Sequence, residues 1–428
     1  MTTSPEEAER RALIAVRAGL DEAVDSGPAA VAAWCGELAV AVEALGAIEL
    51  AALARAAATA GGASSELLAL CRRLCDEGSP ATAATLLAGA HRHAPDDSAI
   101  ALAQVEALGA AGRHDDARRL LQTMHPRLLP DLDRGMALAW HAALDGDLAE
   151  AEAWLPRLAA STAPAHRVRA AELAGMIARA SAIRGVTALD RRDLRGWHFV
   201  ITGGLLLHCS PHGRAVMNGR YGFIHDGYDD CLAGIRRAAA VLATWQRPVA
   251  RVLAPPDRAS AALALAAASD LGCRIEPWTD GDDGAGLIVV HDLAWLTPAQ
   301  QDGLATHHPG QILYVHAASW TVAPPFTPDL VTRLHEHARA PWDSHQSLDA
   351  TTGDLHDVPG DPAGVELLAT RIRGAELAID ALADLPALVE LAAAAGAVRG
   401  DHAAGGLRDH GRRRPARFDS PVPSARFA

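Results

Sequence analysis

The densest group of chemically active side chains lies in the segment MNGRYGFIHDGYDD, residues 217–230. It gathers amide, guanidinium, phenol, imidazole and carboxylate groups in one short run, a composition typical of ligand contact or acid–base chemistry. The structural alternative is an Asn-Gly turn followed by an edge strand and an Asp-capped helix. On the first interpretation, the ligand-binding residues are Asn218, Arg220 and Tyr221, and the catalytic residues are His225 and Asp226.

A second candidate lies at the end of the run LIVVHD, residues 287–292. This run belongs to a buried strand predicted over 286–291. In open α/β sheets, ligands bind beyond the carboxyl ends of the strands. His291 and Asp292 are therefore predicted as catalytic residues, with the carboxylate placed to meet a metal–phosphate or a ribose hydroxyl. The alternative is an acid that only caps the next turn.

A third candidate is Asp257-Arg258, which follows the strand-like RVLAP and opens the helix-like ASAALALAAA. The free N–H groups of a helix N-terminus and a guanidinium together can hold an anion. Both residues are therefore predicted as ligand-binding. The alternative gives Asp257 the simple role of a helix N-cap.

A weak metal half-site is formed by His208, Cys209 and His212, in which the last two have Cys-x-x-His spacing. Possible partners for a tetrahedral ion are His225, Cys231, His335 and His337. No second pair with matching spacing is present, and LHEHA lacks the HExxH separation of zinc proteases. No metal is therefore predicted, and no cofactor is indicated.

Composition removes several function classes. The chain contains no lysine, which excludes a P-loop lysine, a pyridoxal Schiff base and a kinase-type lysine. The formal net charge of −13 disfavours nonspecific nucleic-acid binding by the body of the protein. The exception is the Arg-rich tail, residues 399–428. No serine has a G-x-S-x-G elbow, so nucleophilic hydrolysis is not supported.

Hydropathy and cysteine usage predict a cytoplasmic protein. The longest uncharged apolar stretch, residues 259–269, is shorter than a membrane span, and the first eleven residues are too charged for a secretory signal. The six cysteines are scattered along the chain, which is not the pattern of a disulfide framework. They are expected to be reduced and mostly buried.

An internal repeat organises the N-terminal half. Gly78, Gly112 and Gly146 are 34 residues apart, and each lies in a short polar break between helix-like runs. An alanine follows each glycine after five residues and a leucine after nine. Stacked helix pairs of this size share a continuous core and need a small residue where they cross. The positions are Ala83, Ala117, Ala151, Leu87, Leu121 and Leu155.

This pattern resembles the tetratricopeptide repeat family over about residues 62–165. Pro95 matches the family's closing proline, while Pro130 and Pro164 come one residue late, and the aromatic positions of the family are mostly leucine or alanine here. The resemblance implies a concave surface that binds a peptide or partner protein. The alternative is a platform for the chain's own C-terminal half. Charges predicted for the inner groove, in the segment 113–119, are mixed in sign.

The C-terminal half alternates apolar strand-like and helix-like runs, which predicts a largely parallel sheet covered by helices. Strands are predicted over 249–254, 273–278, 286–291 and 311–316, and helices over 229–245, 258–271, 298–305 and 328–339. HFVIT-GG-LLLHC predicts a hairpin with its turn at Gly203-Gly204. Further Ala- and Leu-rich helices are expected after residue 363.

The segments PPDR and LIVVHD together vaguely resemble the phosphoribosyltransferase fold, in which an early loop meets pyrophosphate and an acidic strand end precedes a phosphate loop. Here residues 293–298, LAWLTP, lack the small Thr/Gly-rich cradle of that family. The resemblance implies, as an alternative function, a transferase-like enzyme acting on a phosphorylated or nucleotide-like molecule. That enzyme would need Asp257, Arg258 and Asp292 to line one pocket with the histidines of 208–226.

The predicted architecture is a helical N-terminal cap (1–61), tetratricopeptide-like repeats (62–190), an α/β domain with C-terminal helices (191–396) and a disordered Arg-rich tail (397–428). This fold class, an α solenoid followed by a mostly parallel α/β sheet, predicts a protein-interaction scaffold. Its repeats would bind a protein or peptide and its α/β domain a small, anionic ligand. The tail is the only part expected to touch nucleic acid.

Overall fold

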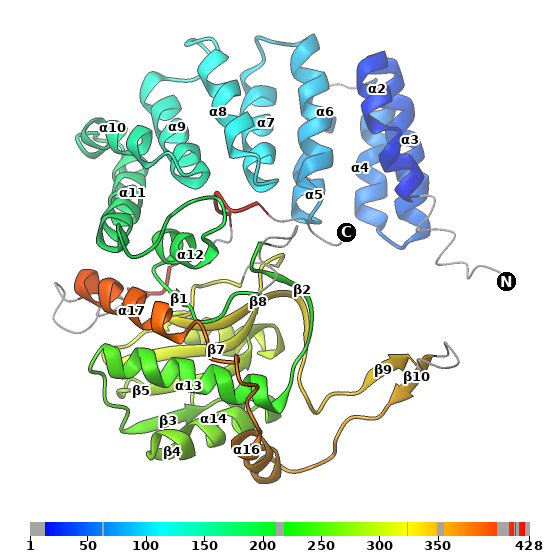
Figure 1. Cartoon of the computed structure of the whole chain (residues 1–428). Coiled ribbons are helices and arrows are strands. Elements are labelled where there is room, and N and C mark those ends of the chain that lie inside the picture. The colour runs from blue at the N-terminus through cyan, green and yellow to red at the C-terminus, as the bar shows by residue number, and fades with distance from the viewer. Residues whose placement is uncertain are drawn as a thin grey trace. The chain divides into compact units, whose positions relative to one another are not determined.

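The computed structural model describes residues 13–61, 64–210, 218–322, 324–348, 355–399, 411–414, 416 and 419–423. The chain forms two compact units, Met1–Ala174 and Gly175–Ala428. Figure 1 labels their elements. Among the described helices, none combines the length and apolar character that crossing a bilayer requires.

The first unit is a succession of helices in which consecutive members pack against each other. This arrangement confirms the predicted helical solenoid, because each helix pair buries its apolar stripe only against its neighbours. The helices are α2 (Leu20–Ser26), α3 (Pro28–Ala44), α4 (Ile48–Thr59), α5 (Ser64–Asp76), α6 (Pro80–His93), α7 (Ser98–Ala110), α8 (His114–Thr123), α9 (Asp131–Asp145) and α10 (Leu148–Ala159). Helix α11 (Pro164–Ile183) includes residues of both units.

The repeat positions predicted from spacing occupy equivalent places in the structure. Gly78, Gly112 and Gly146 have φ angles of 76°, 70° and 94°, the left-handed conformation that favours glycine between two helices. The three alanines that follow them are fully buried, as close helix crossing requires. Leu155 differs from its counterparts because it is only half-buried, beside a proline at position 156 inside α10.

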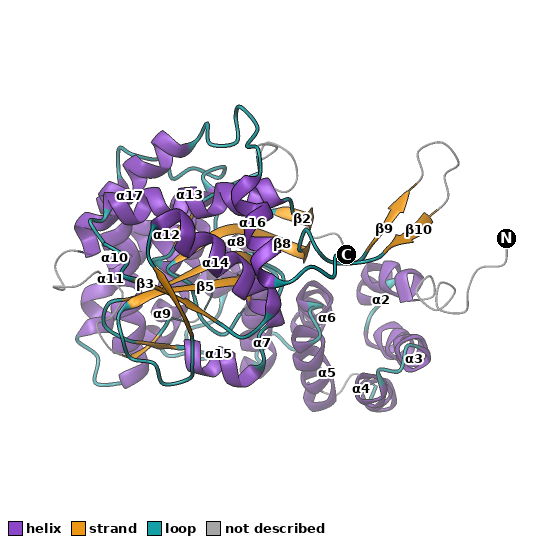
Figure 2. Cartoon of the chain, turned by 90° about the horizontal axis from the view of Figure 1, so that it is seen from below, coloured by secondary structure: helices purple, strands orange, loops and turns teal. Residues whose placement is uncertain are grey.

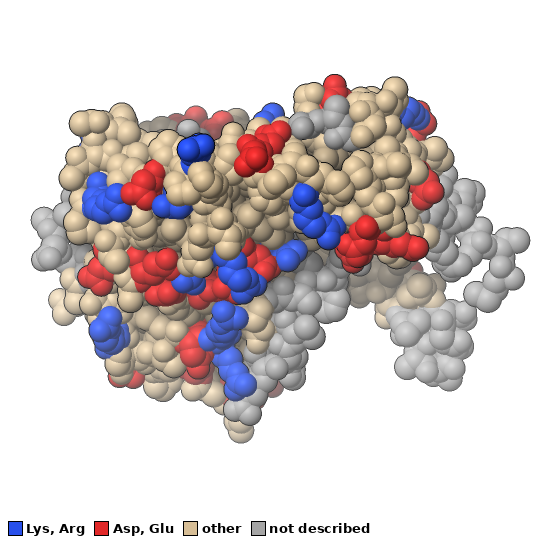
Figure 3. Space-filling view, turned by 90° about the horizontal axis from the view of Figure 1, so that it is seen from above, with Lys and Arg blue, Asp and Glu red and all other residues tan. Residues whose placement is uncertain are grey.

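Charged side chains of the repeats largely satisfy one another. Arg118 of α8 reaches Asp145 at 3.0 Å, Asp147 at 2.9 Å and also Glu150, which ties it to the turn between α9 and α10. Arg119 pairs within its own helix. Arginine and acidic side chains are interspersed on the face of the molecule that Figure 3 shows. That face presents no broad patch of a single sign.

The second unit is built on a seven-stranded sheet with the order β1-β8-β7-β5-β3-β4, in which β2 also pairs with β8. Every pairing in this sheet is parallel, which confirms the predicted α/β class. The strands are β1 (Leu205–Leu206), β2 (Tyr221–His225), β3 (Arg251–Ala254), β4 (Arg274–Pro277), β5 (Gly286–Asp292), β7 (Gln311–Ser319) and β8 (Leu330–Arg339).

Helices cover this sheet, and two small antiparallel pairs complete the unit. α13 and α14 contact the sheet, and α16 and α17 pack against them (Figure 2). The hairpin of β9 (His345–Leu348) and β10 (Leu355–Val358) projects from the rest of the unit. The helices are α12 (Leu194–Thr202), α13 (Tyr228–Thr244), α14 (Arg258–Leu271), η1 (Leu293–Trp295), α15 (Pro298–Leu304), α16 (Val365–Gly374) and α17 (Leu385–Arg399).

Two predicted elements are wrong. The hairpin at Gly203-Gly204 is instead the end of α12, where Asp193 caps the start and Gly203, at φ 82°, forms the C-cap before β1. The predicted helix 328–339 is strand β8. It lies between β7 on one side and β1 and β2 on the other, and its first six residues are buried. Burial on both faces of a sheet overrides the weak local preference for a helix.

The prediction of a disordered tail is wrong for the described residues after 410. The strand β11 (Gly411–Arg412) pairs antiparallel with β6 (Thr306–His307). Arg413 is buried and lies 2.8 Å from the equally buried Asp329. This arginine is therefore committed to the fold and is not available to nucleic acid.

Candidate functional site

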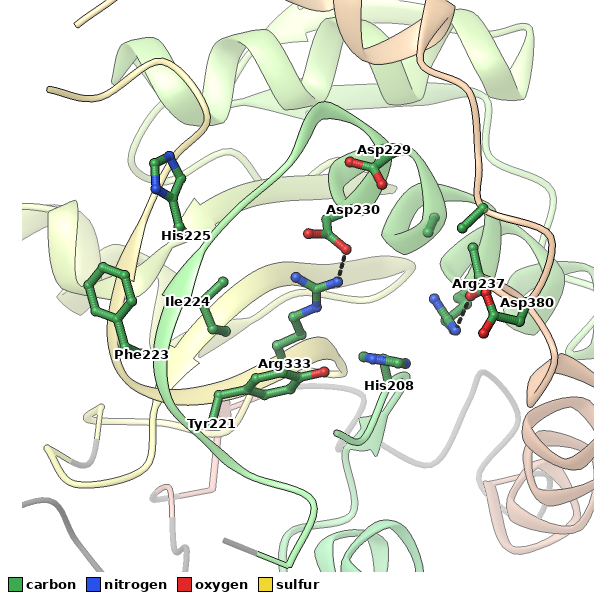
Figure 4. A pocket seen from close by; sticks show the side chains of 13 residues that line it. His208, Tyr221, Phe223, Ile224, His225, Asp229, Asp230, Arg237, Arg333 and Asp380 are labelled. Carbon is green, nitrogen blue, oxygen red and sulfur yellow. Dashed lines mark hydrogen bonds and ion pairs between the residues drawn. The ribbon is translucent and has the colours of Figure 1, made fainter. Parts of the chain in front are cut away.

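A pocket of about 440 Å³ lies over one edge of the sheet, where β1 and β2 follow each other along β8. β1 pairs with the start of β8 and β2 with its second half, and Arg333 lies between the two paired stretches (Figure 4). The pocket contains three residues that the sequence singled out, His208, Tyr221 and His225. Its other polar residues are Asp229, Asp230, Arg237, Arg333 and Asp380.

Both arginines of the pocket already have carboxylate partners. Arg333 pairs with Asp230 and, at 3.2 Å, with Asp226. Arg237 lies 2.7 Å from Asp384 and donates a 2.6 Å hydrogen bond to a backbone carbonyl. Within the described part of the chain, Asp229 and Asp380 form no ion pair. The side chains that line the pocket therefore carry two positive and three negative charges, because Asp230 adds the third carboxylate.

Two side chains of the pocket, His208 and Tyr221, are neutral near pH 7. Burial, followed by the charges of Arg237 and Arg333, lowers the pKa of His208 to about 4. Burial raises the pKa of Tyr221 to about 12. At neutral pH both groups therefore offer hydrogen bonds without charge.

The neutral state of His208 predicts how stability depends on pH. An unfolded histidine binds its proton near pH 6.5, whereas the folded ring does so only near pH 4. Between these values the unfolded state binds more protons, so stability present above pH 6.5 is lost as the pH falls. Through His208, the free energy of unfolding of the native chain should fall by on the order of 2–3 kcal/mol between pH 7 and pH 4. His208→Asn should not show this contribution. Urea unfolding at both pH values tests this, and equal losses in the two proteins would contradict it.

A buried cluster lies next to the pocket, on the other side of Arg333. It consists of Asp226 after β2, Cys231 in α13, His291 in β5 and His316 in β7, all of them buried. Oδ2 of Asp226 lies 2.7 Å from Nε2 of His316, 3.4 Å from Nε2 of His291 and 3.5 Å from Sγ of Cys231.

The protonation of this cluster follows from its contacts. Burial alone would raise the pKa of Asp226, but His316 and His291 outweigh it and hold the pKa well below its ordinary value. Burial and the adjacent Asp226 charge raise the pKa of Cys231 well above its ordinary value. Asp226 is thus a carboxylate and Cys231 a thiol. One oxygen, one sulfur and two nitrogens form a donor set that could hold a metal ion.

Asp292, predicted as catalytic together with His291, points to a different place. One of its oxygens accepts a 2.9 Å hydrogen bond from the backbone of Ala294, and so caps η1. The other lies 3.1 Å from Nε2 of His335. Neighbouring residues of a strand point to opposite faces, which separates Asp292 from the cluster that contains His291.

The predicted anion site has other contacts in the structure. Asp257 caps α14 by accepting a 2.8 Å hydrogen bond from the backbone of Ser260. Arg258 donates hydrogen bonds to the backbone carbonyls of Asp361 and Ala363, the latter at 2.6 Å. Neither Asp257 nor Arg258 lines the pocket over β8, and Asp292 is also absent from its lining.

Asn218 and Arg220 contact the chain's own C-terminal residues. Asn218 donates to the carbonyl of Pro423, and Arg220 donates to the carbonyl of Val422 and to the hydroxyl of Ser420, both at 3.1 Å. Asn218 has a φ of 44° and precedes a glycine, as expected for the alternative Asn-Gly turn. β2 and α13 follow in the order which that alternative predicted.

The weak metal half-site is not assembled in the described structure. His208 lines the pocket, Cys209 is partly buried outside the cluster, and His212 lies outside the described residues. The sequence interpretation missed His316, Arg333 and Asp230, and considered Cys231 only as a partner of the half-site. The available signal was that two predicted strands, 286–291 and 311–316, both end in Val-His.

Comparison with known proteins recognises only part of the repeat unit. A family model described as a tetratricopeptide repeat matches residues 74–131. The match includes Gly78 and Gly112 but ends before Gly146, and it suggests a role in protein interaction. No curated protein and no solved structure matches the chain.

Proposed function

We propose that this chain is an interaction protein whose tetratricopeptide repeats dock a partner protein and whose α/β unit holds a small polar ligand. The observation that carries the ligand part is the pocket over β8, which combines a volume of about 440 Å³ with converging charged and hydrogen-bonding groups. Such a concave, mostly preformed site with a few directed polar groups is typical of small-molecule binding.

The charges of the pocket favour a ligand with an amine or another cationic group, rather than the anion that the sequence predicted. An anion would have to separate Arg333 from Asp230, or Arg237 from Asp384, and would leave a carboxylate without its cation. A cation would instead lie near the carboxylates of Asp229 and Asp380, which form no ion pair within the described residues. His208 and Tyr221 add uncharged donors and acceptors.

The alternative of a transferase-like enzyme has less support. It required Asp257, Arg258 and Asp292 to share a pocket with His208 and His225, and the pocket over β8 contains only the two histidines. Arg258, which had to grip phosphate, instead holds backbone carbonyls.

A thermal-shift screen of the full chain tests the ligand class. We expect small diamines or amino sugars to raise the melting temperature, because a ligand that binds only the folded state stabilises it by about 2.7 kcal/mol at a hundred times its Kd. Asp229→Asn should abolish the shift. Asp283→Asn, which removes an exposed carboxylate from the loop between β4 and β5, is the matched control and should retain it.

Two outcomes would count against the ligand proposal. One is the absence of any shift with cationic compounds. The other is a shift with sugar phosphates or nucleotides that survives in the Asp229→Asn variant. The docking part is tested separately: a partner cross-linked to the full chain should carry its cross-links on α5–α10, and cross-links confined to the α/β unit would refute it.

A further inference from the structure

The cluster beside the pocket is assembled from four separate elements. Asp226 follows β2, Cys231 lies in the first turn of α13, and His291 and His316 lie near the carboxyl ends of the neighbouring parallel strands β5 and β7. One ligand atom from each residue lies within 4.8 Å of the others. The side chains of all four are at most 3% exposed.

The spacing of these atoms is close to that of a tetrahedral zinc site. Zinc bonds of about 2.0–2.3 Å place the ligand atoms of a tetrahedron about 3.3–3.7 Å apart. From Oδ2 of Asp226, His291 at 3.4 Å and Cys231 at 3.5 Å already fall within that range. Of the three pairs that include Asp226, the one with His316, at 2.7 Å, has to open, and the remaining ligand atoms lie within 4.8 Å of one another.

Hydrogen bonding alone does not account for the cluster. His316 donates or accepts at both ring nitrogens, through Asp226 and through the hydroxyl of Tyr314 at 3.3 Å. By contrast, the side chain of His291 is only 1% exposed, yet its Nδ1 has no hydrogen-bond partner among the described residues, and its Nε2 lies 3.4 Å from Asp226 without hydrogen-bond geometry. A buried ring nitrogen without a hydrogen bond is costly unless another group satisfies it.

The surroundings orient the four residues as ligand-supporting groups do in metal sites. The Tyr314 hydroxyl at the second nitrogen of His316 in turn bonds Thr332 at 3.0 Å. Arg333 contacts the other oxygen of Asp226 at 3.2 Å. The ring of His291 stacks on Trp295 at 5.3 Å between centroids, and the ring of Trp342 lies 5.6 Å from the His291 ring in a tilted arrangement.

Helix α13 packs very close to this network, and the close packing requires a glycine in the helix. A β-carbon at Gly234 would lie 2.6 Å from the Tyr314 hydroxyl and 2.8 Å from Nδ1 of His316. Glycine therefore lets the helix that carries Cys231 come close to the ends of the strands.

We propose that Asp226, Cys231, His291 and His316 bind one Zn²⁺ in a structural site that fastens the start of α13 to β5 and β7. The mixture of sulfur, nitrogen and oxygen selects zinc over magnesium or calcium, which prefer oxygen alone. Four protein ligands and near-complete burial leave no open coordination position, which is typical of a structural rather than a catalytic site.

The first test is the metal content of the full chain. Protein from zinc-supplemented cells should contain one zinc per chain by mass spectrometry, and X-ray absorption should show one sulfur and three nitrogen or oxygen ligands. After metal removal, cobalt should give the thiolate charge-transfer band and intense visible bands of a tetrahedral site. Cys231→Ser should lose the charge-transfer band and weaken cobalt binding about 10-fold or more.

Cys273→Ser is the matched control, because Cys273 lies outside the cluster, and its cobalt spectrum should equal that of the native chain. His316→Gln provides a second variant if Cys231→Ser fails to fold. The proposal is overturned if the native chain contains no zinc and binds neither zinc nor cobalt. It is equally overturned if the metal is bound but the cobalt–thiolate band survives in Cys231→Ser.

Discussion

Replacing Arg413 by alanine is expected to destabilise the α/β unit by about 3–5 kcal/mol, because it breaks a buried ion pair by removing one partner. Its Nη1 lies 2.8 Å from Oδ2 of Asp329, and both side chains are at most 2% exposed. Its Nε also donates to the carbonyl of Leu304 at 3.0 Å. Amide hydrogen exchange of peptides from β7 and β8 would measure the loss.

A double variant without either charge separates the effect of the ion pair from that of the packing of the tail. Arg413→Met combined with Asp329→Asn removes both charges, so we expect this pair to lose clearly less than Arg413→Ala alone. An exposed ion pair contributes less than about 1 kcal/mol. If Arg413→Ala lowers the opening free energy measured by hydrogen exchange by no more than that, the C-terminal segment is not bound as described.

Leu121→Ala is expected to cost the repeat unit about 2–5 kcal/mol, the usual range for a fully buried leucine that leaves a cavity. Leu121 is 0% exposed in α8 and occupies the repeat position nine residues after Gly112. The cost should appear as faster amide exchange in α7–α9, while peptides of the α/β unit remain unchanged.

The repeat itself supplies the matched control. Leu155 holds the same position one repeat later, but it is half-buried beside Pro156. Leu155→Ala should therefore cost about 1 kcal/mol, near the centre of the range for ordinary substitutions. Equal costs at the two positions would mean that the third repeat is packed as tightly as the second.

The sequence predicted most of the repeat unit because its signals are local and periodic. A glycine that must adopt a positive φ, a small residue at a helix crossing and a buried leucine recur at fixed spacing. The α/β strands were found for a related reason, since strands buried on both faces are short, continuous apolar runs. β8 was missed because its run, LVTRLHEHAR, mixes polar and apolar residues as an amphipathic helix does.

The site was only partly predictable, because its contacts join distant parts of the chain. Asp226 and His291 were singled out by their neighbours in sequence, whereas His316 becomes their partner only through the order of the strands. Asn218 and Arg220 carried a clear signal of binding, but the group they bind lies about 200 residues further along the same chain. No local pattern identifies such a partner.

The position of Arg413 also determines when the α/β unit can complete its folding during synthesis. Contacts of the repeats join neighbouring helices, so these helices can pack one after another as they leave the ribosome. The α/β unit cannot complete its buried ion pair, or the pairing of β11 with β6, until residue 413 has emerged. A translating ribosome would thus carry a packed solenoid before the β6–β11 pair and the buried ion pair of the α/β unit can form.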